Sequence, residues 1–129
     1  MAMFVGLNPS TADKIKDDPT ARKCMRFAES WGYGGIILAN LFAYRATDRR
    51  KLKVASDPVG PDNDPWLTRL ADEAGIIIAA WGVHGGFMGR DQVVMDLLGE
   101  VHSLGLTKEG KPRHPLYLKS DGRPRLFSG

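Results

Sequence analysis

Two short runs of apolar residues constrain the fold more than any other feature of the sequence. Residues 36–40 (IILAN) and 76–80 (IIIAA) are apolar over most of their length and do not alternate with polar residues. Strands that are buried on both faces of a parallel sheet have this pattern. Residues 2–7 and, more weakly, residues 102–106 form two further apolar runs. We therefore predict four strands at these positions.

Helical patterns separate the predicted strands. A capping aspartate followed by proline opens two of them, at Asp18 and Asp64, and Asp91 can cap a third. The resulting order β-α-β-α-β-α-β, with right-handed crossovers, predicts an α/β protein that is a three-layer αβα sandwich around a four-stranded parallel sheet. We expect a single α/β domain over residues 1–118 and a polar C-terminal tail over residues 119–129.

Length and composition limit the class of protein. A chain of 129 residues suits one domain and can bury roughly two thirds of its unfolded surface. Cys24 is the one cysteine, so an internal disulfide or a cysteine-based zinc cluster cannot form. The first residues lack the pattern of a signal peptide, and no apolar run approaches the ~20 residues that span a bilayer. We therefore expect a cytoplasmic protein with no membrane partner.

Positive charge is concentrated in two segments. The formal net charge is only +3, yet residues 44–53 hold five basic residues against one acidic residue. Residues 107–129 hold six basic residues against two acidic ones. Clustered cations suit a partner that carries phosphates. Ordinary solvated side chains on the surface are the alternative interpretation.

Polar residues follow the first predicted strand, in the region where open parallel sheets bind their ligands. Pro9 holds Asn8 in an extended conformation, so the Asn8 amide could orient a water molecule or, with Pro9 and Ser10, bind a ligand. An Asx-type turn that satisfies the loop backbone is the alternative for Asn8. Ser10 and Thr11 could bind a phosphate or cap the turn that follows.

The second predicted strand ends in Asn40. Its amide offers an acceptor and two donors in one plane, which match the edge of uracil or thymine. The backbone of a neighbouring loop is the alternative partner. Phe42 and Tyr44 could stack on a base, or they could belong to the core or to a lid. Arg45 is a candidate for phosphate binding.

The loops after the third and fourth strands hold the remaining candidates. Trp81 and His84 follow the third strand, and we assign them to ligand binding. His114 lies in a rigid His-Pro loop and could donate to an oxygen on which negative charge develops. Lys108 and Arg113 are further candidates for phosphate binding.

Several other catalytic classes lack their motifs. The sequence has no G-x-S-x-G of a serine hydrolase, no G-x-x-x-x-G-K-[ST] of a P-loop nucleotidase and no G-x-G-x-x-G of a dinucleotide enzyme. Three scattered histidines without paired carboxylates do not predict a metal site. We expect no metal and no cofactor.

The chain resembles the bacterial and phage family known as domain of unknown function 1643. The resemblance covers roughly residues 4–118 and is carried by GLNPSTAD, DDPTARKC, WGYGGIILANLFAYRATD, DPVGPDND, AAWGVHG and LGLTKEGKPRHPLYL. Members of that family usually have some residues before the first of these motifs, so we expect the chain to be short at its N-terminus.

A remoter resemblance is to the uracil-DNA glycosylase superfamily, through GLNPS, IILANLF, IIIAAWG and RHPLYL in the same order. It implies a uracil-DNA glycosylase-like fold in which Asn8 positions the attacking water, Asn40 reads the base and His114 stabilises the developing negative charge. Two features depart from that superfamily. Asn8 replaces the stronger aspartate base, and the last loop lacks the S-P-L wedge, for which Leu116 and Tyr117 could substitute.

The resemblance implies hydrolysis of an N-glycosidic bond to a nucleobase in DNA. The alternative is a non-catalytic nucleotide- or nucleic-acid-binding module on the same fold, and the two departures favour it. An enzyme that acts on free nucleosides or on an unrelated small molecule is a third possibility. The first two hypotheses require Asn8, Asn40 and His114 to meet at one edge of the sheet, with nucleic acid or a nucleotide as the partner.

Overall fold

A computed structural model describes residues 1–9, 19–45, 49–119 and 122–127, without the side chains of Arg49 and Tyr117. The candidate residues Ser10 and Thr11, and the predicted cap at Asp18, therefore lie outside the described residues.

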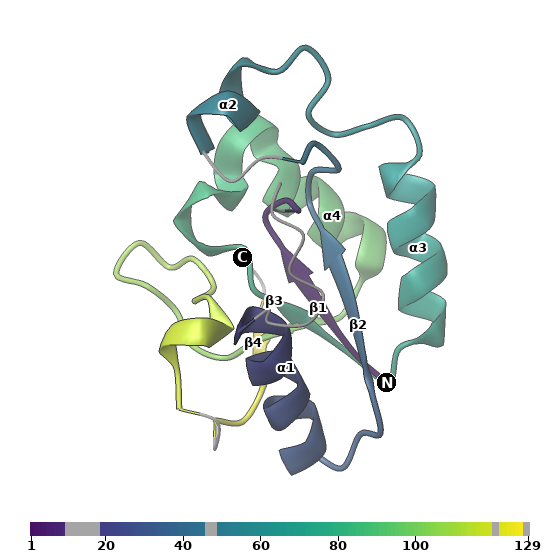
Figure 1. Cartoon of the computed structure of the whole chain (residues 1–129), viewed down its shortest axis with the longest axis vertical. Helices are drawn as coiled ribbons and strands as arrows, with labels where there is room; N and C mark the ends of the chain where they lie inside the picture. Colours follow the sequence, from purple (N-terminus) through teal and green to yellow (C-terminus); the bar gives the residue numbers. More distant parts are fainter. Residues whose placement is uncertain (10–18, 46–48, 120–121, 128–129) are drawn as a thin grey trace.

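Five strands form one sheet in the order β2-β1-β3-β4-β5 (Figure 1). The central strand β1 (Ala2–Gly6) pairs in parallel with β2 (Ile36–Asn40) on one side and with β3 (Ile76–Ala79) on the other. β4 (Val101–Ser103) is parallel to β3, and β5 (Arg125–Phe127) is antiparallel to β4. The positions of the first three predicted strands are thus confirmed almost to the residue. The predicted burial of residues 36–40 on both faces is wrong, because β2 is an edge strand and Leu38 is 47% exposed.

The fifth strand corrects the prediction of a four-stranded, purely parallel sheet. β5 lies within residues 119–129, which we expected to form a polar tail. Phe127 is 8% exposed, and its ring centroid lies 6.4 Å from that of Trp81. One apolar side chain therefore anchors an otherwise polar segment to the core. β4 is also shorter than predicted, since the chain turns away after it through Gly105, whose φ is 139°.

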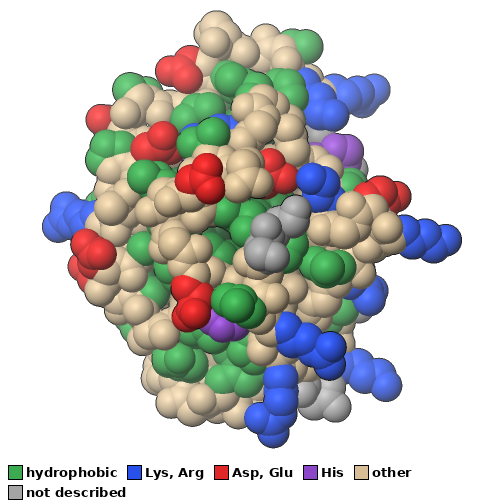
Figure 2. All heavy atoms as spheres, turned by 180° about the vertical axis from the view of Figure 1, so that it is seen from behind, with side chains coloured by type: hydrophobic (Ala, Val, Ile, Leu, Met, Phe, Trp, Pro, Cys, Tyr) green, Lys and Arg blue, Asp and Glu red, His purple; other side chains and the backbone are tan. Residues whose placement is uncertain are grey.

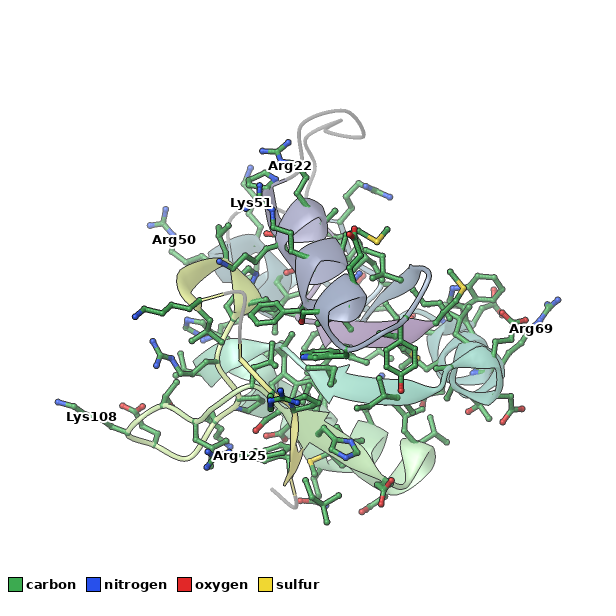
Figure 3. All side chains as sticks on the ribbon, turned by 90° about the horizontal axis from the view of Figure 1, so that it is seen from below. Arg22, Arg50, Lys51, Arg69, Lys108 and Arg125 are labelled. Carbon is green, nitrogen blue, oxygen red and sulfur yellow. The ribbon has the colours of Figure 1, made fainter. Side chains whose placement is uncertain are left out.

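Helices cover both faces of the sheet and make three layers (Figures 1 and 3). α1 (Pro19–Ser30) packs on one face. α3 (Asn63–Glu73) and α4 (Arg90–Leu98) pack on the other face. The predicted α/β class and the predicted helix on each side of the central strands are confirmed.

Alternate side chains of β1 enter the two cores. Ala2 and Phe4 pack with α1, while Met3 and Val5 pack in the core under α3 and α4. None of these four side chains is more than 2% exposed. β1 is buried on both faces, as continuous apolar strands of parallel sheets are.

Both helices on the α3 and α4 face begin before their predicted caps. Asp64 and Asp91 lie in the first helical turns and do not cap them. Each carboxylate has a cationic partner, since Asp64 accepts from Arg90 at 2.8 Å and Asp91 accepts from Lys111 at 3.1 Å. A carboxylate in a first turn is also favoured by the helix dipole.

Three short elements were not predicted. α2 (Arg49–Val54) follows the loop after β2, and Leu52, which is 1% exposed, ties it to the core. η1 (Gly82–Gly89) is a pair of 3₁₀ turns between β3 and α4, and η2 (Pro115–Tyr117) is a single turn after β4. α2 escaped prediction because a six-residue helix with one anchoring apolar residue has no periodic pattern.

Gly85 in η1 is a point of close packing. A Cβ on Gly85 would lie 2.1 Å from Cδ1 of Trp81, which is far inside van der Waals contact. Trp81 is 3% exposed and belongs to the core under α3 and α4. The glycine therefore lets η1 lie directly against the indole ring.

We expect Gly85→Ala to lower the free energy of unfolding by about 1–3 kcal/mol or more, because the added methyl must displace a buried ring. Gly86→Ala is the matched control, since its Cβ would meet nothing closer than 3.7 Å. That control should change stability by less than about 0.5 kcal/mol. Urea unfolding of both variants measures the difference, and equal losses would contradict the packing described for Trp81.

Candidate functional site

The loops that follow β1 and β2 leave the sheet side by side. Gly6 pairs with Asn40 at the carboxyl ends of the two strands. The pairing extends beyond the strands, where the Phe42 N–H donates to the carbonyl of Leu7 at 3.0 Å. The structure thus brings together the loops that hold Asn8 and Asn40.

Asn8 ties these two loops to each other. Its amide nitrogen donates to the carbonyl of Tyr44 at 3.1 Å and to the carbonyl of Pro9 at 3.2 Å. The first bond crosses from one loop to the other over 36 residues of sequence. The amide nitrogen therefore bonds to the loop backbone. This agrees with the alternative interpretation of Asn8, in which its side chain satisfies the backbone of the loop.

Asn40 is half-buried at the edge of the sheet. Within the part of the chain that the structure describes, its side-chain amide makes no hydrogen bond. Its Oδ1 atom packs against Gly6, where a Cβ would lie only 3.0 Å away. The amide is therefore held in a narrow space and still has donors and an acceptor to offer to a ligand.

The aromatic candidates have different environments. Phe42 is fully buried, and its ring centroid lies 5.6 Å from that of Phe87, so it belongs to the core. Trp81 is buried as well, and its indole N–H has no hydrogen-bond partner among the described residues. Tyr44 is 39% exposed, so its ring is accessible. Of these three aromatic residues, only Tyr44 is placed to stack on a base.

His114 is fixed by its own turn. Its Nδ1 atom accepts from the Leu116 N–H at 3.2 Å, where it caps η2. In a neutral imidazole the proton then lies on Nε2, which can donate. η2 packs on α1, on the opposite face of the sheet from α3 and α4. His84 lies half-buried in η1.

Two further side chains hold the loop after β2 and were not predicted. Arg90 is 4% exposed, and its Nε and Nη2 atoms both donate to the carbonyl of Leu41, at 3.1 and 2.8 Å. Asn63 donates to the carbonyls of Asn40 and Leu41, at 3.1 and 2.9 Å. Burial of a charge costs several kcal/mol, so a buried arginine is not expected from an apolar pattern. The sequence feature that could have pointed to Arg90 is its position at the start of a helix, directly after a glycine-rich loop.

Exposed basic side chains gather on one side of the molecule (Figures 2 and 3). In Figure 3, Lys51, Lys108 and Arg125 all lie in the half of the view away from Arg69 of α3, with Lys51 toward the top, Lys108 at the far left and Arg125 toward the bottom. Figure 2 shows Lys and Arg along one side, with most of the visible Asp and Glu away from it. The two basic segments of the sequence therefore contribute to one surface, which we call the basic side.

Arg45 and Arg113, two further candidates for phosphate binding, are exposed too. Arg45 lies in the loop after β2, and Arg113 follows the turn that holds Lys108. No ion pair is recorded for Lys51 or Lys108 among the described residues. Lys51 and Lys108 can therefore meet a phosphate without first losing a buried partner.

A hollow of about 440 Å³ lies beside the first turn of α3. Ala43 and Gly60 contribute to its wall, and Trp66, which is 52% exposed, forms part of it together with Arg69. The guanidinium of Arg69 lies 5.7 Å from the centre of the Trp66 ring. None of the candidate residues named from the sequence lines this hollow.

Two kinds of feature are absent from the described residues. No three His, Cys, Asp or Glu side chains are grouped so that they could hold a metal ion. No helix in the described ranges has the length and apolar character needed to cross a membrane.

The chain is an α/β protein with a mostly parallel five-stranded sheet, and the candidate residues Asn8 and Asn40 lie where β1 and β2 end. Residues 1–116 match the model of the family described as "Protein of unknown function (DUF1643)". The chain belongs to this family, as its motifs predicted. Neither a curated protein nor a solved structure matches it significantly.

We expect Asn8→Ala to lower the free energy of unfolding by about 0.5–1.5 kcal/mol, because two hydrogen bonds to carbonyls are lost. Asn8→Asp should cost more, since it places a carboxylate oxygen against the carbonyl oxygens of Pro9 and Tyr44. Urea unfolding gives the two values. An Asn8→Asp variant as stable as the wild type would show that Asn8 does not donate to these carbonyls.

Proposed function

We propose that the chain binds single-stranded nucleic acid or a nucleotide at the carboxyl ends of β1 and β2. The observation that carries this proposal is the basic side, to which two segments distant in sequence contribute. Phosphate contacts by lysine and arginine supply most of the sequence-independent affinity for nucleic acids. The exposed positions of Lys51, Lys108 and Arg125 suit such contacts.

Asn40 is the residue that we assign to the base. Its amide makes no hydrogen bond in the described part of the chain and lies at the sheet edge. An amide can donate to a carbonyl and accept from the N–H of uracil or thymine at the same time. The base must be presented unpaired for this edge to be reached. Tyr44, which is partly exposed, is the candidate for stacking on it.

A second candidate function is hydrolysis of an N-glycosidic bond, on a fold like that of the uracil-DNA glycosylases. The observation that favours it is the direct neighbourhood of the Asn8 and Asn40 loops. Release of free base from a panel of oligonucleotides with uracil or damaged bases tests it. If the wild-type protein binds these oligonucleotides but releases no base, the chain is a binding module.

We expect Lys51→Gln and Lys108→Gln each to weaken binding to single-stranded DNA and to reduce the salt slope by about 0.7 per lost phosphate contact. Fluorescence anisotropy over a series of salt concentrations measures both quantities. Arg69→Gln is the matched control, because Arg69 carries the same charge at the opposite end of the molecule. Equal effects of all three variants would contradict the claim that the basic side binds the nucleic acid. A wild-type protein that does not bind would contradict it as well.

We expect Asn40→Ala to abolish a preference for uracil or thymine over cytosine, with a loss of about 1–3 kcal/mol of discrimination. Asn40→Asp should favour cytosine, since a carboxylate accepts from the cytosine amino group. Gly6→Ala should act in the same direction as Asn40→Ala but less strongly, because its methyl would press on Oδ1 of Asn40. Competition between oligonucleotides that differ in one base measures these preferences. If both Asn40 variants keep the wild-type preference, Asn40 does not read the base.

A further inference from the structure

We infer that Arg90 is a positioning residue for Asn40, and that it sets base selectivity without touching the base. This inference rests on the proposed function, because it concerns how the base-reading amide is held in place.

The carbonyl of Leu41, directly after Asn40, is the point at which Arg90 acts. This oxygen accepts from Nε of Arg90 at 3.1 Å, from Nη2 of Arg90 at 2.8 Å and from Nδ2 of Asn63 at 2.9 Å. A carbonyl oxygen has two lone pairs, so three donors use its whole capacity. The peptide group between Leu41 and Phe42, one residue beyond Asn40, is therefore held from α3 and from α4 at once.

The charge environment of Arg90 argues against a purely stabilising role. The one salt-bridge partner described for Arg90 is Asp64, whose side chain is 43% exposed. The remainder of the guanidinium faces the backbone and the ring of Phe42, whose centre is 6.0 Å away. Because Asp64 is 43% exposed, a methionine at position 90 would leave its carboxylate in contact with solvent and not as an unpaired buried charge. What a methionine at position 90 could not supply is the pair of directed hydrogen bonds to Leu41.

Asn40 depends on this support because the described structure gives its side chain no hydrogen bond of its own. On one side its backbone is held by pairing with Gly6 in β1. On the other side it is held by Asn63 and, through Leu41, by Arg90. Without Arg90, the Leu41–Phe42 peptide would keep its bond from the Phe42 N–H to Leu7 but would lose two of the donors to its carbonyl. We expect this to loosen the turn after Asn40, so that the amide is held less firmly in the orientation that matches a base edge.

The experiment compares Arg90→Met, Arg90→Lys and Asn40→Ala with the wild type. Affinity for single-stranded DNA and its salt slope are measured by anisotropy, and the uracil-over-cytosine preference is measured by competition. We expect Arg90→Met to keep the salt slope and to lose the base preference about tenfold, which is about 1.4 kcal/mol. Arg90→Lys should recover part of the preference, since its ammonium can donate to Leu41 but lacks the planar fork. Arg69→Met is the control at an exposed arginine and should change neither quantity.

The outcomes separate the inference from the proposed function. If the wild type has a base preference that Asn40→Ala abolishes and Arg90→Met retains, the inference is wrong and the proposed function stands. If the wild type has no base preference, both the base-reading part of the proposed function and the inference are wrong. If Arg90→Met does not fold, Arg90→Lys and Asn63→Ala decide, since each removes some of the donors to Leu41. Unchanged preference in both would overturn the role of Arg90.

Discussion

The burial of β1 on both faces is the constraint on which the rest of the structure depends. Every side chain from Ala2 to Val5 enters one of the two cores, so none of them can take part in binding. Polar chemistry is possible only where β1 and its neighbours leave the sheet. Gly6 is the last residue of the strand, and its pairing with Asn40 decides which side chains meet there.

The packing at this edge explains why its residues are held so closely. Gly6 has no Cβ, and this allows Oδ1 of Asn40 to lie against the backbone of β1. Phe42 is buried two residues later and lies beneath the guanidinium of Arg90. The turn from Asn40 to Phe42 therefore has a strand on one side and a buried cation on the other. The orientation of a side chain on such a rigid support is fixed more firmly than that of a side chain on a solvated loop.

Much of the sheet and of its helices could be predicted from the sequence. The parts that were missed share one cause, because they depend on contacts that a local pattern does not report. The first three strands, α1 and α3 show apolar patterns and turn signals that report local burial. β5 and α2 each have a single buried apolar side chain, Phe127 and Leu52, in segments whose polar composition hides them. Arg90 depends on a tertiary contact that runs against the apolar pattern. The position of His114 depends on how η2 packs on α1, which no local pattern specifies.

The asparagine at position 8 limits the chemistry that this edge of the sheet can perform. Its amide nitrogen donates to two carbonyl oxygens, and a carboxylate cannot donate. An aspartate at this position would lose both of these bonds, including the one that joins the two loops. A reaction at this site must therefore proceed without a strong base at position 8. Cleavage of a glycosidic bond can meet this condition, because negative charge develops on the departing base and can be stabilised by fixed hydrogen-bond donors. Binding without turnover meets it as well, so the same asparagine is compatible with a glycosylase and with a module that only holds the base.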